Sequence, residues 1–228
     1  SHFAVLLKMT KKKVFFLHRS GYDYKYFTKK IFGFGLRSIL ASIESAVSNF
    51  SSDRIHLATD AEYRDLPYQF MSKARVLPNW SDKYIGSVSK SDHFLFVGRL
   101  THQKNIVQLL LSFPKELRLT IVGDGPLRDQ VSDIIERRQL SVVLHQHMEH
   151  QKLLRLMKQS KALICCSDYE GNPKVVIEAL VNRVPVVIKN GKGLDTLFSD
   201  NTLGIKFSSF NSLASVLKKI DEFQINEE

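Results

Sequence analysis

Two glutamates, Glu170 and Glu178, lie eight positions apart around a predicted helix start near Pro173. Proline is favoured in the first turn of a helix, where its missing N–H is not needed. A helix start leaves unpaired N–H groups and the positive end of the helix dipole, which together attract a phosphate or another anion. Because carboxylates accept hydrogen bonds from hydroxyl groups, this stretch is typical of a site for a ligand that joins phosphates to sugars, such as a nucleotide sugar.

Two earlier loops carry further candidate ligand-binding residues. Arg99 and Lys104 follow a predicted strand over residues 94–97. They could neutralise a diphosphate leaving group, because arginine offers a bidentate fork and lysine a point charge; solvated surface positions are the alternative. Gly123 and Gly125 follow the next predicted strand, where glycines either let the backbone approach a ring or a phosphate closely or form a plain tight turn.

Metal chemistry is not expected from this sequence. It has no D-x-D pair and no His/Cys/Asp cluster with metal-ligand spacing. We therefore expect no metal and no cofactor, with the nucleotide sugar as a substrate. The two cysteines, Cys165 and Cys166, are adjacent on a predicted strand, and their side chains therefore leave on opposite faces. We interpret them as buried small hydrophobic residues of a protein in the reducing cytoplasm.

Strands and helices alternate from residue 92 onward, which predicts an α/β fold with a Rossmann-type parallel sheet and helices on both faces. Ligands bind at the carboxyl ends of the strands in such sheets, and each candidate residue lies there. The expected strands are 94–97, 119–122, 142–145, 162–166 and 184–188, and the expected helices are 105–112, 127–138, 151–159, 173–181 and 213–223.

The first part of the chain predicts a smaller, partial α/β domain. We expect a domain over residues 1–79, a serine-rich linker over 80–91 and the larger domain over 92–228. The elements expected in the first domain are a strand over 14–18 that ends in His18, a helix over 36–50, a strand over 53–59, a helix over 60–71 with Asp60 as its N-cap, and a strand over 74–78.

Three motifs in this order resemble the C-terminal domain of retaining GT-B glycosyltransferases of the nucleotide-sugar-dependent family 4. The stretch from Glu170 to Glu178 is similar to the E-x7-E signature, and it follows Phe96-Val-Gly-Arg-Leu-Thr-His-Gln-Lys-Asn105 and Ile121-Val-Gly-Asp-Gly-Pro126. The resemblance implies a GT-B-like fold and a metal-independent hexosyltransferase. Such an enzyme moves a sugar from a nucleoside-diphosphate sugar to a glycan or lipid-linked acceptor with retention.

The resemblance also implies a role for individual residues. Arg99 and Lys104 match the diphosphate-binding pair, Glu170 lies near the hydroxyls of the transferred sugar, and Glu178 accepts from the nucleotide ribose. His18 matches a histidine that contacts the donor sugar, although a histidine at a strand end is also commonly structural. The remaining donor-binding positions are Gly98, Gly123, Gly125, Gly171, Asn172, Pro173 and Lys174.

The chain departs from the family pattern at several positions. Trp80 and Arg183 stand where the family usually has glycine, and Lys192-Gly193 and Thr196 stand where it has Gly-Gly and Glu. As a hypothesis, Lys189 or Lys192 could add positive charge at the diphosphate. Nothing corresponds to the first half of the family's N-terminal domain, so the chain is expected to be a fragment, a reduced form, or a half-enzyme that needs a partner chain.

The charge distribution predicts an anionic partner. Residues 1–90 contain 15 Lys/Arg against 7 Asp/Glu, whereas residues 91–228 contain 18 against 16. Residues 19–39 mix aromatic with cationic side chains, which is typical of a peripheral contact with the inner face of a membrane or of a half-buried helix with a basic face. No apolar run is long enough to span a bilayer. Nucleic-acid binding and nicotinamide binding are weaker alternatives, because no motif for either occurs.

Overall fold

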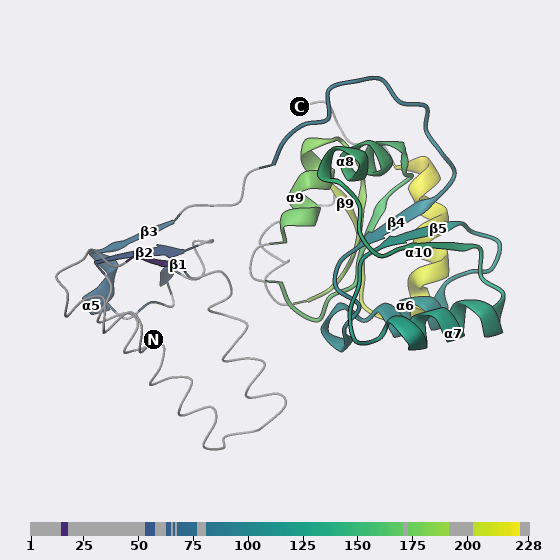
Figure 1. Ribbon diagram of the computed structural model, residues 1–228, viewed down its shortest axis with the longest axis horizontal. Coiled ribbons are helices and arrows are strands. Elements are labelled where there is room, and N and C mark those ends of the chain that lie inside the picture. Colours follow the sequence, from purple (N-terminus) through teal and green to yellow (C-terminus); the bar gives the residue numbers. More distant parts are fainter. Residues whose placement is uncertain are drawn as a thin grey trace, which may run out of the picture. The chain divides into compact units, whose positions relative to one another are not determined.

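The computed structural model describes residues 15–17, 53–57, 63, 64, 66, 68–76, 81–170, 173–191 and 203–223, with the first three described by their backbone alone. The chain divides into two compact units, Ser1–Asn79 and Trp80–Glu228 (Figure 1). The predicted helix over residues 36–50 and the candidate His18 lie outside the described residues, as do Gly171, Asn172, Lys192 and Trp80.

Among the described residues of the first unit, three short strands form a parallel sheet in the order β1-β2-β3. The strands are β1 (Phe15–Leu17), β2 (Arg54–Leu57) and β3 (Ala74–Val76), and each falls within a predicted strand. The predicted helix over residues 60–71 is wrong in extent, because Leu66 lies at a bend and α5 spans only Tyr68–Met71. A proline disfavours helical backbone angles at the residue before it, and Leu66 precedes Pro67.

The second unit contains a parallel sheet of six strands in the order β6-β5-β4-β7-β8-β9. Strands β4 and β5 lie near its centre and are almost continuously apolar and buried, as expected for parallel strands that are covered on both faces. The six strands are β4 (Phe94–Val97), β5 (Leu119–Val122), β6 (Val142–His145), β7 (Leu163–Cys165), β8 (Val186–Lys189) and β9 (Gly204–Phe207).

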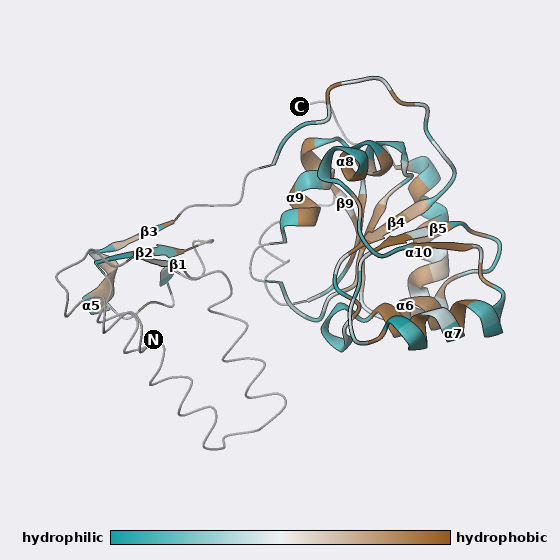
Figure 2. Ribbon diagram, viewed as in Figure 1, coloured by the Kyte–Doolittle hydropathy of each residue, from teal (hydrophilic) through white to brown (hydrophobic). Residues whose placement is uncertain are grey.

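Helices cover both faces of this sheet, which confirms the predicted layering. Helices α6 (Ile106–Ser112), α7 (Arg128–Arg138) and α10 (Leu213–Lys219) pack on one face, and α8 (His150–Gln159) and α9 (Lys174–Val181) pack on the other. Figure 2 shows hydrophobic strands between these layers, with polar residues in the surrounding loops.

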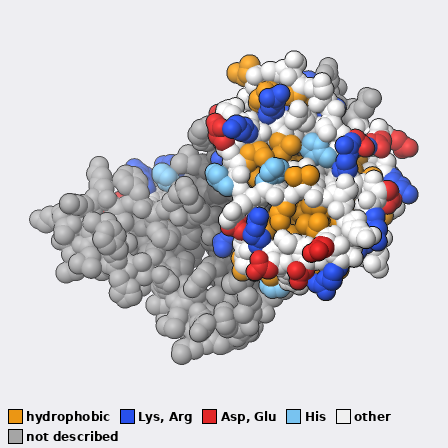
Figure 3. All heavy atoms as spheres, turned by 45° about the vertical axis from the view of Figure 1, so that its right-hand side comes forward, with side chains coloured by type: hydrophobic (Ala, Val, Ile, Leu, Met, Phe, Trp, Pro, Cys, Tyr) orange, Lys and Arg blue, Asp and Glu red, His pale blue; other side chains and the backbone are white. Residues whose placement is uncertain are grey.

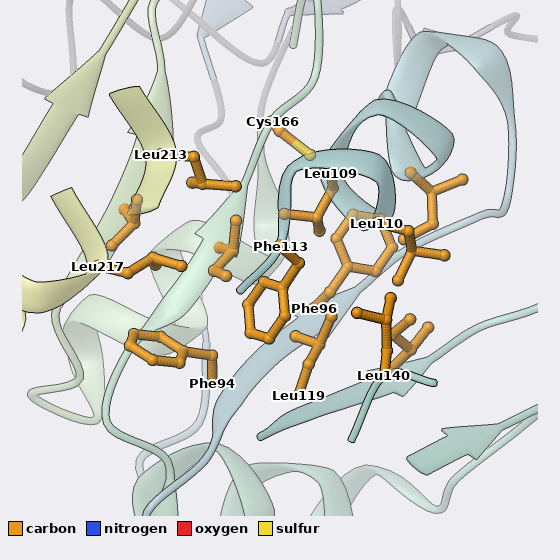
Figure 4. Close-up of a cluster of buried hydrophobic side chains, with 14 of the residues drawn as sticks. Phe94, Phe96, Leu109, Leu110, Phe113, Leu119, Leu140, Cys166, Leu213 and Leu217 are labelled. Carbon is orange, nitrogen blue, oxygen red and sulfur yellow. The ribbon is translucent and has the colours of Figure 1, made fainter. Parts of the chain in front are cut away.

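Alternation along β4 supplies both hydrophobic cores. Successive side chains of a strand point to opposite faces. Phe94 and Phe96 accordingly pack with Leu109, Phe113 and Leu213 in one cluster (Figure 4). Leu95 faces the other way and packs with α8 and α9, in the cluster that includes Met157 and Val176. The sheet is therefore held rigidly between two helical layers, with its loops free to carry polar side chains.

Among the boundaries that differ from the prediction, three have clear local reasons. Strand β8 begins at Val186 and not at residue 184, because the N–H of Val184 completes the end of α9 by donating to Ala179 O at 2.9 Å. Helix α6 begins at Ile106, since a short 3₁₀ turn (His102–Lys104) precedes it and Asn105 between them has a left-handed φ of 51°. The helix predicted to reach residue 223 ends at Lys219 and continues as a 3₁₀ turn.

Strand β9 was not predicted. It is only four residues long, and its burial pattern shows no simple alternation. It pairs with β8, and a Cβ on Gly204 would lie 2.1 Å from the carbonyl oxygen of Val186. Only glycine lets the two backbones approach so closely here.

Residues 81–91, within the predicted linker, run along the ends of α8 and α9. The N–H of Tyr84 donates to Asn182 Oδ1 at 2.8 Å, and Lys90 Nζ donates to the carbonyl oxygen of Ser160 at 3.1 Å. This segment is thereby fixed to the second unit. Figure 3 shows charged side chains of both signs spread over the visible face of this unit, in keeping with the near-balance of charge in residues 91–228.

Candidate functional site

The strand order reverses between β4 and β7 at the carboxyl edge of the sheet, which is the position of the ligand crevice in open α/β sheets. The chain passes from β4 to β5 and β6 on one side and then returns to β7 on the other side of β4. The loops after β4 and β7 therefore lead away from each other, the arrangement in which open α/β sheets bind ligands. The predicted residues Arg99 and Lys104 lie after β4, and Glu170 lies after β7.

Lys104 and Glu170, from the loops after β4 and β7, are in direct contact at this edge of the sheet. Lys104 Nζ forms a salt bridge with Glu170 Oε1, and the same oxygen accepts a hydrogen bond of 2.6 Å from Ser167 Oγ. The side chains of Lys104 and Glu170 are 23% and 12% exposed, so neither is a solvated surface charge. Two residues 66 positions apart in the sequence are thus brought together by the pairing of β4 with β7.

A second charged cluster lies beside the first and extends to β8. Asp168 Oδ1 accepts hydrogen bonds from Asn105 Nδ2 at 2.8 Å and from Lys189 Nζ at 3.2 Å. Asn105 Nδ2 also donates to the carbonyl oxygen of Cys166 at 2.9 Å. Sequence reasoning missed Asp168 and Ser167, since nothing in the local pattern distinguishes them from other polar loop residues.

Glu178 is buried inside α9, with only 4% of its side chain exposed. Glu178 is therefore not an exposed helix glutamate. Lys174 Nζ lies 3.5 Å from Glu178 Oε1, and His150 Nδ1 lies 3.9 Å from the same oxygen. A buried carboxylate is costly without a nearby cation, and Lys174 supplies that charge.

Pro173 is the N-cap of α9 and not its first helical residue, which corrects the expected helix start. Its carbonyl oxygen accepts from the N–H groups of Val176 at 2.9 Å and Ile177 at 3.1 Å. The N–H groups of Lys174 and Val175, which have no partner within an α-helix, therefore form the exposed start of the helix. The helix start remains at the carboxyl edge of β7, where the sequence predicted an anion site.

Gly123 and Gly125 are required by contacts between the loops that follow β4 and β5. A Cβ on Gly123 would lie 1.9 Å from Gly98 O, and one on Gly125 would lie 2.6 Å from Leu100 O. The N–H of Gly98 donates to Val122 O at 3.0 Å. The group that these glycines approach in this structure is protein backbone, and their approach to a ring or a phosphate stays a prediction. A Cβ on Gly98 itself would meet only ordinary contacts, the nearest being Lys104 Cε at 3.7 Å.

Arg99 is exposed at the same edge, two positions after β4. It is not part of the Lys104–Glu170 contact, and none of the ion pairs among the described residues includes its guanidinium. Nearby, Asp124 Oδ2 accepts a hydrogen bond of 2.8 Å from Gln146 Nε2, and Asp124 Oδ1 accepts from the N–H of Gly125. These hydrogen bonds hold the pKa of Asp124 below its usual value and shape the loop after β5.

Comparison with known proteins identifies the family. Residues 81–228 match the family model described as "Glycosyl transferases group 1". The chain belongs to this glycosyltransferase family. The match covers the whole described part of the second unit, including the Lys104–Glu170 contact and Glu178.

Several curated glycosyltransferases are similar in sequence. An N-acetyl-D-galactosaminyltransferase of Campylobacter jejuni, named for an acceptor linked to PP-undecaprenol, is 29% identical over 173 residues, or 70% of this chain and 47% of the relative. An uncharacterised glycosyltransferase of Methanocaldococcus jannaschii is 31% identical over 139 residues, or 56% and 36%. A putative teichuronic acid biosynthesis glycosyltransferase of Bacillus subtilis, TuaC, is 32% identical over 135 residues, or 58% and 33%. The chain thus spans less than half the length of these relatives.

Solved glycosyltransferase structures confirm the GT-B-like α/β fold. Anabaena HepE in complex with UDP and glucose superposes with a TM-score of 0.76 at 16% identity, covering 96% of this chain and 65% of that one. Sucrose-phosphate synthase from Thermosynechococcus elongatus superposes with a TM-score of 0.73 at 16% identity, covering 91% and 58%. At this identity the likeness concerns the fold alone.

Two further findings on this glycosyltransferase chain concern metal binding and membrane-spanning helices among its described residues. No three His, Cys, Asp or Glu side chains of the described residues are grouped so that they could hold a metal ion. None of the helices among those residues is long and apolar enough to cross a membrane.

The two cysteines are structural. Both are free thiols, and they face opposite sides of the sheet, as predicted: Cys166 belongs to one hydrophobic cluster and Cys165 packs against the other. Burial, together with the charge of Glu170, raises the pKa of the Cys165 thiol to about 11. Cys166 Sγ donates to the carbonyl oxygen of Lys104 at 3.1 Å, which helps to place the loop after β4.

Proposed function

We propose that this chain is the donor-binding part of a glycosyltransferase that moves a sugar from a nucleoside-diphosphate sugar to a glycan or lipid-linked acceptor. In this proposal the reaction proceeds with retention and without a metal ion. The observation that carries it is the contact between Lys104 and Glu170, because it joins the predicted diphosphate cation to the first glutamate of the E-x7-E stretch in one crevice.

The diphosphate would leave against the cations of the β4 loop. Negative charge develops on the diphosphate as its bond to the sugar breaks, and fixed groups that stabilise this charge lower the barrier most. Lys104 is held in place by Glu170, and Arg99 projects from the same loop. The start of α9 supplies the N–H groups of Lys174 and Val175 and the positive end of the helix dipole. The acceptor would attack on the face from which the diphosphate departs, which gives retention.

The two glutamates would bind the hydroxyl groups of the donor. Glu170 carries a carboxylate in the crevice, with one oxygen occupied by Lys104 and Ser167, and it would accept from the hydroxyls of the transferred sugar. Glu178 would accept from the ribose hydroxyls, with Lys174 stabilising its charge. The proposal retains a sugar contact by His18 and backbone contacts by Gly98, Gly123, Gly125, Gly171, Asn172 and Pro173.

The acceptor is proposed from the relatives and from the basic N-terminal segment. The Campylobacter jejuni relative is named for an acceptor on PP-undecaprenol and the Bacillus subtilis relative for teichuronic acid biosynthesis. Both names favour an envelope glycan or its lipid-linked precursor. A peripheral contact of residues 19–39 with an anionic membrane surface would bring the enzyme to such an acceptor.

A second candidate function is that of a donor-binding subunit that needs a partner chain. The chain spans less than half the length of its curated relatives, so an acceptor-side half could come from another polypeptide. One structural neighbour, at a TM-score of 0.59 and 20% identity, is described as a GtfA/B complex. A chain of this kind would bind nucleotide when alone and would transfer sugar only after its partner is added.

Calorimetric titration with UDP-sugars and GDP-sugars tests the donor site. We expect wild type to bind one of the two classes, and Arg99→Ala and Lys104→Met to bind it at least tenfold more weakly, because each loses a charge-assisted contact with phosphate. Lys152→Met is the matched control, since this lysine is exposed on α8 and pairs only with Glu149 among the described residues. Equal binding by wild type and both site variants would remove the diphosphate assignment.

A further inference from the structure

Lys189 lies at the carboxyl end of β8, at the same edge of the sheet as the proposed diphosphate site. Its side chain is 19% exposed, and its ammonium donates to Asp168 Oδ1 in the loop after β7. The same carboxylate oxygen accepts from Asn105, the residue that directly follows Lys104. Three adjacent strands, β4, β7 and β8, therefore place two lysines and two carboxylates in neighbouring pairs, Lys104 with Glu170 and Lys189 with Asp168.

The backbone after Lys189 confirms how closely β8 approaches the β7 loop. A Cβ on Gly191 would lie 2.8 Å from Ser167 O and 3.0 Å from Asp168 O. The chain therefore returns against the loop that carries Glu170 only two residues beyond Lys189. The backbone on both sides of the Lys189–Asp168 hydrogen bond is therefore packed together, and that bond places the ammonium beside the β7 loop.

Lys189 has more N–H donors than its hydrogen bond to Asp168 uses. An ammonium group has three N–H donors, and the bond to Asp168 Oδ1 occupies one of them. Asp168 is also oriented by the neutral amide of Asn105, so its position does not depend on Lys189 alone. Two N–H donors of the partly exposed ammonium are therefore available to a ligand at this edge of the sheet.

The charge of the site also calls for another cation. Glu170 already compensates Lys104 in this structure, which leaves Arg99 as the only other cation of the proposed pair. A departing nucleoside diphosphate gains a further negative charge as its bond to the sugar breaks. In the proposed metal-independent reaction, a further cationic side chain would stabilise this charge together with Arg99, Lys104 and the start of α9.

We propose that Lys189 is a third cation of the diphosphate site, with its ammonium held at the crevice by Asp168 and available to a phosphate oxygen. This proposal rests on the donor-binding function proposed above and adds to it a residue from β8, outside the three motifs that suggested that function. Lys189 binds the phosphates, and Asp168 keeps the ammonium beside the β7 loop.

Binding measurements that separate phosphates from nucleoside test this role. We would titrate wild type, Lys189→Met and Lys189→Arg with UDP and GDP, and with uridine and guanosine, at two salt concentrations. Lys189→Met should weaken binding of the diphosphate by about tenfold to a hundredfold, make that binding less salt-dependent, and leave nucleoside binding unchanged. Lys189→Arg should recover most of the affinity because it restores the charge, and Lys152→Met should behave as wild type.

The outcomes distinguish this proposal from the one on which it rests. Unchanged diphosphate affinity in Lys189→Met, while Lys104→Met is impaired, would overturn the role of Lys189 and leave the donor site intact. Equal losses for diphosphate and nucleoside, together with a lower Tm, would show that Lys189 is a strut, which also overturns its proposed role. If wild type bound neither UDP nor GDP, both proposals would fail together.

Discussion

The side-chain amide of Asn182 donates a hydrogen bond of 2.7 Å to the carbonyl oxygen of Glu178, one helical turn earlier in α9. The amide oxygen of Asn182 accepts from the N–H of Tyr84 at 2.8 Å. Asn182 is 2% exposed. One buried side chain thus connects the helix that carries the second glutamate of the proposed donor site to the segment that enters the second unit.

Replacing Asn182 by alanine is expected to destabilise the protein. The change leaves the Tyr84 N–H without its acceptor and opens a small cavity, so we expect the free energy of unfolding to fall by about 2–3 kcal/mol. Urea unfolding of wild type and Asn182→Ala measures this difference. Asn211→Ala, at an exposed asparagine, is the control and should change stability by less than about 0.5 kcal/mol. Equal midpoints for all three proteins would contradict the role of Asn182.

Replacing Arg183 by glycine is expected to stabilise the protein. Arg183 has a left-handed φ of 55° just after α9, where its N–H donates to Leu180 O and the N–H of Val184 donates to Ala179 O, both at 2.9 Å. Glycine adopts this conformation without the steric cost that other residues meet, so Arg183→Gly should raise the free energy of unfolding by about 1 kcal/mol. Thermal and urea unfolding measure the gain.

The C-cap of α7 and one residue inside that helix provide matched controls for the Arg183 prediction. Gln139, with a φ of 52° at the end of α7, should respond to glycine as Arg183 does. Arg137 lies inside the same helix, where glycine should instead cost about 1 kcal/mol. A loss of stability in both Arg183→Gly and Gln139→Gly would show that the side chains contribute more than the backbone strain.

Stability should decrease in mild acid because of His93. This histidine is buried at the start of β4 with Nε2 unpaired, and burial, followed by the positive charge of Arg118, lowers its pKa. The unfolded chain therefore binds the proton more readily than the folded one. The free energy of unfolding should therefore be unaffected by His93 above the pKa of the unfolded histidine, about 6.5. Below that pH it should fall by at most about 1.4 kcal/mol per pH unit.

Unfolding midpoints measured from about one pH unit above to about one and a half pH units below the usual histidine pKa of about 6.5 test the effect of His93. His93→Gln should flatten this part of the pH profile, whatever its effect on stability at neutral pH. His147→Gln, at an exposed histidine, should retain the wild-type slope. An identical slope in wild type and His93→Gln would assign the acid sensitivity to other groups.

Glu178→Gln is expected to weaken nucleoside binding, in contrast to Lys189→Met. The carboxylate is proposed to accept from the ribose hydroxyls, so uridine or guanosine and the corresponding diphosphate should lose affinity to a similar degree, about tenfold. Glu149→Gln serves as the control, because Glu149 is exposed and pairs with Lys152 on α8. Unaltered nucleoside affinity in Glu178→Gln would leave its burial beside Lys174 and His150 as a purely structural feature.

The two cysteines should be almost unreactive while the protein is folded. The thiolate is the reactive form, and the raised pKa of about 11 at Cys165 makes it scarce near neutral pH. A thiol reagent should label the native protein slowly and both cysteines rapidly in urea. Ser87→Cys, at an exposed position, should add one site that reacts at once. Rapid labelling of the native wild type would show that the β7 region opens readily.

The sequence by itself determined the layered architecture and the positions of most elements. Strands β4, β5 and β6 coincide with their predicted ranges, because short apolar runs between loop residues are a local signal. The four predicted ranges of the helices α6 to α9 differ from the structure by one residue at their starts: the N-cap was counted as helical in α6, α7 and α9, and the first helical residue, His150, was missed in α8. The same alternation of strands and helices predicted the loops that contain Arg99, Lys104, Glu170 and Gly123.

Only the tertiary structure decided which of those residues meet. The order β6-β5-β4-β7-β8-β9 depends on how buried faces pack over long distances, and no local pattern encodes it. That order places Lys104 against Glu170 and brings Lys189 to Asp168, and the packing of α8 beside α9 buries Glu178 near His150. Strand β9 escaped prediction for the same reason, since four residues form a strand there only because β8 offers an edge with which they can pair.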